Sequence, residues 1–128
     1  MGVFVWCYDI GLAVYRLFLG LASLLHPKAR LWVQGRRGWE TRLRTDLEPF
    51  ADRKLRIWMH CASLGEFEQG RVLLDTLRQS YPDALLVLSF FSPSGYQHRK
   101  TYPKADLVCY LPLDGPLAAR AFLDLVRP

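Results

Sequence analysis

Leu55-Arg56-Ile57-Trp58-Met59-His60-Cys61-Ala62-Ser63-Leu64-Gly65-Glu66 is the stretch that decides the fold class of this 128-residue chain. Residues 55–60 predict a buried β-strand, because the run is short and mainly apolar. Ser63 followed three residues later by Glu66 is a capping box, which predicts the start of a helix. We expect that helix from Glu66 to Tyr81. A strand that leads directly into a helix is the first half of a βαβ unit.

The same alternation of strand and helix continues to the end of the chain. It indicates an α/β fold, with a Rossmann-like parallel sheet and right-handed helical crossovers. The further elements are expected at 84–91 (strand), 93–102 (helix), 107–111 (strand) and 116–126 (helix). The side chains expected to face the core are Phe67, Leu73, Leu74 and Leu77 in the first helix and Leu117, Ala121, Phe122 and Leu125 in the last.

The predicted Rossmann-like domain covers residues 45–128 and ends on a helix, where a further strand is due. A three-stranded sheet that stops there keeps an open edge, and natural proteins usually cover such edges. We therefore expect this domain to be incomplete at its C-terminus, with the chain forming the front part of a longer protein.

An apolar segment precedes this domain. Its only charges are Asp9 and Arg16, and we expect a helix from about Tyr8 to Leu25. Asp9, Arg16 and Ser23 recur every seven residues and so share one narrow stripe. The absence of a cation before Arg16 argues against a cleaved signal peptide, and the uncharged run 17–25 is short of the roughly 20 residues of a full membrane span. A helix that is apolar over most of its circumference is buried in protein or in lipid.

A basic stretch follows the apolar helix directly. From Lys28 to Arg44 it has six cations against one acid. Cations and tryptophans beside an apolar helix are typical of a segment at an anionic membrane surface. The alternative is a helix docked on the domain core, with a solvated basic loop behind it. The first interpretation makes residues 1–44 a membrane-proximal segment, in which Arg16, Trp32, Arg36, Arg37 and Trp39 contact the membrane.

Composition limits the class of protein. Hydrophobic residues make up 51% of the chain and charged residues 23%, which fits one globular domain and excludes disorder. Three cysteines without a CxxC pair argue against a disulfide framework or a zinc–thiolate site, and fit a reducing compartment. The net charge of +5 favours an anionic partner, such as a membrane surface, a nucleic acid or a phosphorylated ligand.

Two loops at the carboxyl ends of the predicted strands are the candidate sites, because ligands of open α/β sheets bind there. In the first loop Gly65 is expected to let the backbone turn tightly. Ser63 and Glu66 have two interpretations. They cap the helix, or Glu66 is a carboxylate that takes a proton from a substrate hydroxyl as a general base.

The second candidate loop follows the strand at 84–91. Ser92 before Pro93 is a good helix start, and the free N–H groups of such a start can also hold a phosphate or a carboxylate. The two interpretations are therefore a plain helix cap and an anion-binding site made by Ser92, Ser94 and Gly95.

Other catalytic motifs are absent from the sequence. It has no GxGxxG, GxxxxGK[ST] or HExxH pattern, which weakens dinucleotide, P-loop and zinc-protease interpretations. His60 and Ser63 lack an acidic partner and a GxSxG elbow, and His60 and Cys61 point to opposite faces of their strand. We expect no metal site and no cofactor.

Several features occur in a distinctive order along the chain. The most specific is the block from His60 to Glu66, which has the pattern H-x-x-S-x-G-E. It is accompanied by the apolar N-terminal helix, Gly35-Arg36-Arg37, Ser92-Pro93-Ser94-Gly95-Tyr96 and Tyr110-Leu111-Pro112-Leu113-Asp114. In this order they resemble the N-terminal, acceptor-side domain of the 3-deoxy-D-manno-octulosonic acid (Kdo) transferases of lipopolysaccharide synthesis.

The resemblance implies an inverting glycosyltransferase of GT-B architecture that moves Kdo from CMP-Kdo to a lipid A precursor. It also implies a location at the cytoplasmic face of the bacterial inner membrane, no metal in the transfer, and Glu66 as general base on a glucosamine hydroxyl. Family members continue into a C-terminal domain that binds CMP-Kdo. That domain is missing from this chain, so we expect the chain alone to be inactive.

Two functions of other classes compete with this one. The first is a non-enzymatic peripheral-membrane or anion-binding module of Rossmann type. The second is a nucleic-acid binder, suggested by the basic charge. It is the weaker, because the cations adjoin an apolar helix instead of a polar groove with interleaved aromatic residues.

Overall fold

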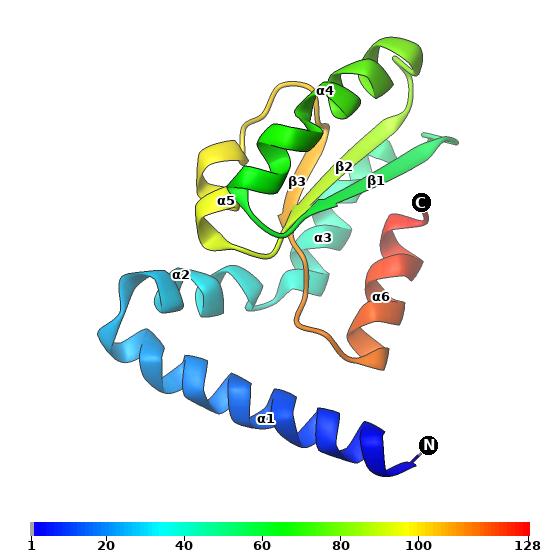
Figure 1. The fold of residues 1–128 in the computed structure, drawn as a ribbon. Coiled ribbons are helices and arrows are strands. Elements are labelled where there is room, and N and C mark those ends of the chain that lie inside the picture. Colours follow the sequence, from blue (N-terminus) through cyan, green and yellow to red (C-terminus); the bar gives the residue numbers. More distant parts are fainter. Residues whose placement is uncertain (1) are drawn as a thin grey trace.

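A parallel sheet of three strands organises the fold, in the order β1 (Arg56–Cys61), β2 (Leu85–Phe90) and β3 (Leu107–Tyr110) (Figure 1). This computed structural model describes residues 2–128, with side chains from Val5 onward. Both strand pairs are parallel, and His60 lies opposite Ser89 in the first pair. The α/β class and the parallel sheet are therefore confirmed, and each strand lies within one residue of its predicted range.

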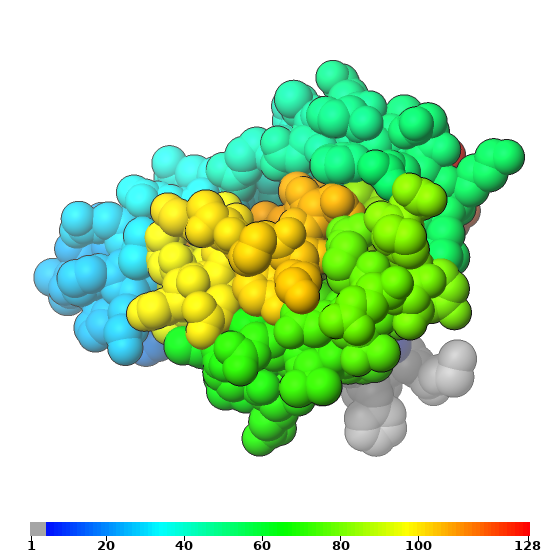
Figure 2. Space-filling model, turned by 90° about the horizontal axis from the view of Figure 1, so that it is seen from above, coloured from blue at the N-terminus to red at the C-terminus, as the bar shows by residue number. Residues whose placement is uncertain are grey.

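Helices cover both faces of the sheet, so β2 is buried at every residue. One face packs on α4 (Leu64–Ser80) and α5 (Pro93–Arg99), which lie side by side with the segment before β3 in Figure 2. The other face packs on α3 (Trp39–Leu47) and α6 (Pro116–Val126). The first core contains Cys61, Phe67, Leu74, Ala84, Leu86, Leu88 and Phe90, and the second contains Leu43, Leu47, Leu85, Val87, Leu107, Phe122 and Val126.

Two side chains predicted to face the core are exposed. Leu73 on α4 is 58% exposed, because this helix faces the sheet with Phe67 and Leu74. Leu117 is 85% exposed, because it lies in the first turn of α6, which contacts the core further along its length through Phe122 and Val126. The predicted inward positions of Leu73 and Leu117 are therefore wrong.

The basic stretch is helical, whereas the docked-helix alternative expected a solvated loop. It forms α2 (Pro27–Arg36) and α3, joined at Gly38 in the left-handed region with φ of 58°. Leu43 and Leu47 of α3 belong to the second core. The expected division between residues 44 and 45 therefore falls inside a helix that packs on the sheet. Met1, the first residue of the expected 1–44 segment, lies outside the described residues.

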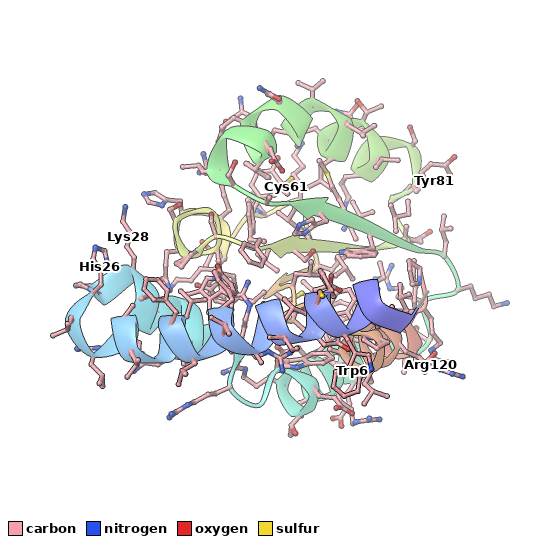
Figure 3. The ribbon with its side chains drawn as sticks, turned by 60° about the horizontal axis from the view of Figure 1, so that its bottom comes forward. Trp6, His26, Lys28, Cys61, Tyr81 and Arg120 are labelled. Carbon is pink, nitrogen blue, oxygen red and sulfur yellow. The ribbon has the colours of Figure 1, made fainter. Side chains whose placement is uncertain are left out.

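The helix α1 (Gly2–Leu25) runs along the outside of the molecule and contacts mainly α2 (Figures 1 and 3). As its heptad spacing predicted, Asp9 and Arg16 lie on one side, facing residues 114–118 across a cavity of about 350 Å³. Of the described helices, this one is long and apolar enough to cross a membrane, judged by length and composition. Its exposed apolar side chains are Val5, Trp6, Ile10, Val14, Leu17, Phe18, Leu21, Leu24 and Leu25.

Candidate functional site

The two predicted loops adjoin at the carboxyl end of the sheet. The first connects β1 to α4, and the second connects β2 to α5. The Ser92 backbone N–H donates to the carbonyl oxygen of Ala62 at 2.9 Å, which joins the loops directly. The arrangement follows from the parallel pairing of β1 and β2, which brings both strand ends to one edge.

Glu66 caps its own helix and also keeps part of its carboxylate free. Its backbone N–H donates to Ser63 Oγ at 3.3 Å, and its Oε2 accepts from the backbone N–H of Ala62 at 2.6 Å. The Ser63 cap is therefore present, whereas the reciprocal bond of the predicted capping box goes to the N–H of Ala62 and not to that of Ser63. The side chain is exposed, and within the described residues Oε1 accepts no hydrogen bond. One oxygen thus holds the carboxylate in place, while the other has no hydrogen-bond partner among the described residues.

Gly65 does not make the tight turn that we expected. It lies inside the first turn of α4, and it is not among the described glycines with positive φ. A Cβ placed there would meet only Ser63 Oγ, at an ordinary 3.8 Å. The fold therefore accepts an alanine at this position, and the glycine leaves open space next to Glu66.

The second loop is explained largely by capping and packing. Ser92 Oγ accepts from the Gly95 N–H at 3.1 Å and lies 3.3 Å from Ser94 Oγ. Gly95 is buried, and a Cβ there would lie 2.4 Å from the ring of Phe90. The helix cap is present, and anion binding by Ser92, Ser94 and Gly95 stays a prediction.

Three polar side chains on the neighbouring strands β1 and β2 form a hydrogen-bonded relay beside these loops. Trp58 Nε1–H donates to Ser89 Oγ at 2.8 Å, and His60 Nδ1 lies 2.9 Å from the same oxygen. Ser89 is fully buried in the otherwise apolar strand β2. Burial lowers the pKa of His60. Arg36 acts in the same direction, whereas the Ser89 backbone and Glu66 oppose the shift.

The comparisons with known proteins decide the family. The family model for 3-deoxy-D-manno-octulosonic-acid transferase (kdotransferase) matches residues 33–128. The chain belongs to this family. The resemblance inferred from the motifs is thus confirmed.

Two curated members of the Kdo transferase family give the extent of the similarity. The 3-deoxy-D-manno-octulosonic acid transferase of Haemophilus influenzae is 34% identical over 73 residues, which cover 56% of this chain and 17% of that protein. The enzyme of the same name from Aquifex aeolicus is 33% identical over 73 residues, covering 56% of this chain and 20% of that protein. The match therefore spans about a fifth of the length of these relatives. No solved structure gave a significant match.

Two residues of the basic segment that were predicted to contact the membrane are buried against the domain. Arg36 is buried, with its guanidinium over the rings of Trp32 (3.9 Å), Phe91 (4.8 Å) and Tyr110 (5.1 Å). Its Nη2 donates to the carbonyl oxygen of Phe91 at 2.8 Å, and burial lowers its pKa to about 10. Trp32 is buried as well. These two side chains face the domain in this structure, so the predicted membrane contact does not hold for them.

The other three predicted membrane contacts differ from one another. Arg37 is exposed, and Arg16 is exposed while its Nη2 donates to the carbonyl oxygen of Asp114 at 3.4 Å. Trp39 is half-buried against the second core, beside Phe122. Among the predicted membrane contacts in the basic segment, Arg37 is thus the one whose side chain is exposed.

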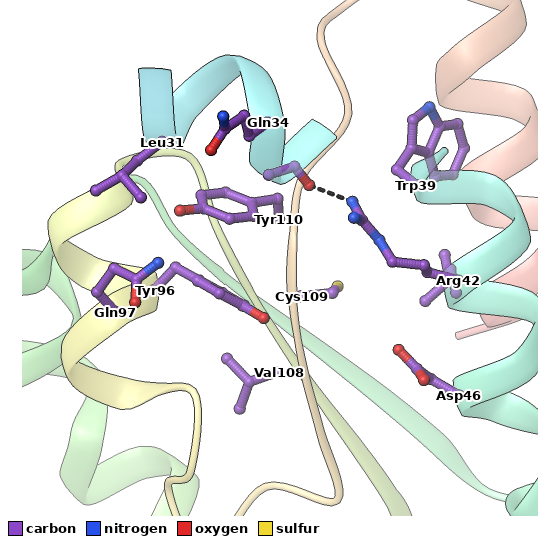
Figure 4. Close-up of a pocket in the computed structure, with 12 residues that line it drawn as sticks. Leu31, Gln34, Trp39, Arg42, Asp46, Tyr96, Gln97, Val108, Cys109 and Tyr110 are labelled. Atoms are coloured by element: carbon purple, nitrogen blue, oxygen red, sulfur yellow. Dashed lines mark hydrogen bonds between the residues drawn. The ribbon is translucent and has the colours of Figure 1, made fainter. Parts of the chain in front are cut away.

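A cavity of about 330 Å³ lies between α2, α3, α5 and β3 (Figure 4). Tyr96 and Tyr110 stack beside it, and Arg42 donates to the carbonyl oxygen of Gly35 across its rim. None of its lining residues comes from the Glu66 loop. The cavity is therefore separate from the candidate site at the carboxyl ends of β1 and β2.

Proposed function

We propose that this chain is the acceptor-side part of a Kdo transferase that moves Kdo from CMP-Kdo to a lipid A precursor. In this proposal α1 forms the membrane-proximal part, and the sheet with the helices packed on it forms the acceptor-side part of a GT-B enzyme. The observation that carries the proposal is the exposed Glu66 side chain at the carboxyl end of β1, with one carboxylate oxygen held by the Ala62 N–H and the other without a partner among the described residues.

The proposed reaction is an inverting displacement without a metal. A glucosamine hydroxyl of the acceptor attacks the anomeric carbon of Kdo, the bond from that carbon to CMP breaks, and CMP leaves with the bonding electrons. Glu66 Oε1 takes the hydroxyl proton during the attack. The Ala62 N–H holds Oε2 and so orients the carboxylate toward the acceptor. CMP-Kdo binds to a C-terminal domain.

The surface of α1 supports a site at a membrane. Its outward side is a continuous row of exposed apolar side chains, and soluble proteins rarely leave so large an apolar surface uncovered. Arg37, at the C-terminal end of α2, adds an exposed cation. We place the enzyme at the cytoplasmic face of the bacterial inner membrane, where an anionic surface and the lipid acceptor are both present. A non-enzymatic peripheral-membrane module of Rossmann type would use the same surface.

Replacing Glu66 by glutamine tests the proposal. The change is made in this chain joined to the remaining part of the Haemophilus influenzae relative, which supplies the rest of a transferase. A general base contributes roughly 10²–10⁴-fold, so Glu66→Gln should lower the single-turnover transfer rate by about that factor while acceptor binding stays near normal. Glutamine retains the cap, so the fold should be preserved.

Glu40→Gln is the matched control. Glu40 is exposed on α3 and pairs with Arg44 four residues on, far from the Glu66 loop along the chain. This variant should transfer Kdo at the normal rate. Normal transfer by Glu66→Gln would show that Glu66 only caps its helix. A folded wild-type chimera that binds membranes without transferring Kdo would favour the non-enzymatic module.

A further inference from the structure

His60 has a free nitrogen at the end of β1, next to the proposed acceptor site. Its Nδ1 faces Ser89 Oγ, whereas Nε2 has no protein partner in the part of the chain that the structure describes. The residue is the last but one of its strand and is exposed, and the Glu66 loop begins directly after that strand. The imidazole thus has one buried side and one side open to a ligand.

The hydrogen bonds of Ser89 determine which nitrogen of His60 carries the proton. An indole N–H only donates, so Ser89 Oγ accepts from Trp58. The hydroxyl hydrogen of Ser89 can then point to His60 Nδ1, which lies 2.9 Å away, and in this arrangement Nδ1 accepts. A neutral imidazole that accepts at Nδ1 carries its proton on Nε2. In this arrangement the outward nitrogen of His60 is an N–H donor, and the NMR experiment below tests this tautomer.

The Ser89 hydroxyl has two side-chain partners. It satisfies the part-buried Trp58 indole N–H, and it also contacts the ring of His60. Ser89 Oγ contacts both Trp58 and His60, and these contacts fix the orientation of the His60 ring. Fixed orientation and a fixed tautomer are what a residue needs to bind a ligand atom with defined geometry.

We infer that His60 contacts the acceptor: its Nε2–H donates a hydrogen bond to an oxygen of the acceptor sugar beside Glu66, and Trp58 and Ser89 are positioning residues for it. This rests on the proposed function. His60 and Glu66 then have complementary tasks at one sheet edge, since the first only donates and the second only accepts. The acceptor is held by one oxygen while another hydroxyl loses its proton.

The tautomer is tested first, without any transfer assay. Nitrogen NMR of the intact chain at pH 7.5 should show His60 protonated at Nε2 and unprotonated at Nδ1, and Ser89→Ala should give a mixture of tautomers. His26 is exposed and has no side-chain hydrogen bond at its helix start, so it serves as the reference. A proton on Nδ1 of His60 in the unmodified chain would overturn the inference.

The contact itself is tested in the chimeric transferase by two substitutions that keep different parts of the imidazole. Glutamine places its amide N–H near the position of Nε2, and asparagine near that of Nδ1. His60→Gln should therefore keep the acceptor KM within about twofold, whereas His60→Asn and His60→Ala should raise it roughly three- to tenfold, the range of one neutral hydrogen bond. His26→Ala should change nothing.

The outcomes separate this inference from the proposed function. If Glu66→Gln abolishes transfer while His60→Ala keeps a normal acceptor KM, the function stands and the role of His60 is wrong. Equal KM values for the glutamine and asparagine variants would also overturn it, because the position of the donor would then be irrelevant. Thermal unfolding of each variant checks that the changes in KM do not come from loss of fold.

Discussion

The two oxygens of the Glu66 carboxylate have different surroundings, and this difference makes the residue suited to both of its interpretations. Oε2 accepts from the Ala62 N–H, whereas Oε1 has no partner among the described residues. The first contact holds the side chain at the start of α4, and a general base needs the second oxygen unpaired. The cap therefore helps the proposed chemistry, since it removes the rotational freedom of the side chain before a substrate arrives.

Gly65→Ala tests whether Gly65 is needed for the fold or leaves space for a ligand. Position 65 is helical and a Cβ fits there, so we expect the free energy of unfolding to stay the same or to rise by up to ~1 kcal/mol. We also expect the acceptor KM in the chimera to rise severalfold, because the methyl group occupies space next to Glu66. Chemical denaturation and steady-state kinetics measure the two effects.

Gly35→Ala is the contrasting variant. A Cβ at position 35 would lie 2.3 Å from the ring of Tyr110, so this change should destabilise the fold. If Gly65→Ala left both stability and KM unchanged, the space beside Glu66 would have no role in acceptor binding.

The candidate site was only partly predictable from the sequence. The helix start at Ser63 was predictable, because it depends only on the local spacing of Ser63 and Glu66. The relay through His60 was missed, because it depends on the register that places His60 opposite Ser89 in another strand. The available signal was a single serine in the apolar run Leu85–Phe90, with Trp58 and His60 on one face of β1.

The helices α1 and α2 differ in what covers them. The polar stripe of α1 faces residues 114–118, where Tyr8 OH donates to the Asp114 carboxylate, and its apolar side is open. Helix α2 contacts the sheet end through the buried Arg36. The heptad spacing predicted the stripe of α1. Charge alone could not predict that Arg36 turns inward, because its partners are aromatic rings from distant segments.

Cys7 reports whether α1 enters lipid. It is exposed on α1, whereas Cys61 is buried, and burial raises the pKa of Cys109 to about 12. In solution a water-soluble maleimide should therefore label Cys7 first, since the thiolate is the reactive form. With vesicles of anionic lipid, labelling of Cys7 should fall at least severalfold.

Salt gives the control for the labelling experiment. High ionic strength screens the contribution of exposed cations such as Arg37 but leaves apolar insertion intact, so protection of Cys7 should persist in salt. Equal labelling with and without vesicles would show that α1 stays out of the bilayer.

Alkaline pH should lower the stability of the whole fold. Burial, with a hydrogen bond from Tyr102 OH to Asp75 on α4, raises the pKa of Tyr102 to about 12. Between pH 10 and 12 the unfolded chain has lost this proton while the folded chain retains it. The Tyr102 contribution to the free energy of unfolding is therefore complete below pH 10 and declines as pH rises above it.

Tyr102→Phe isolates this contribution. The difference in free energy of unfolding between the wild type and this variant, measured by urea denaturation, should shrink as pH rises from 9 to 11. Tyr81→Phe is the control, because Tyr81 is exposed and its variant should keep the wild-type pH dependence. A difference for Tyr102→Phe that is constant over this range would contradict the assignment.

The contact between Arg36 and the Phe91 carbonyl links the position of Glu66 to that of the N-terminal helices. Phe91 precedes Ser92, whose N–H bonds Ala62, and the Ala62 N–H bonds Glu66. Helix α2, which packs on α1, is thereby tied to the carboxylate through a short chain of direct contacts. With α1 in the bilayer, as proposed, Glu66 is held at one height above the lipid headgroups. In the proposed transferase, an acceptor hydroxyl would then be selected by its depth relative to the headgroups.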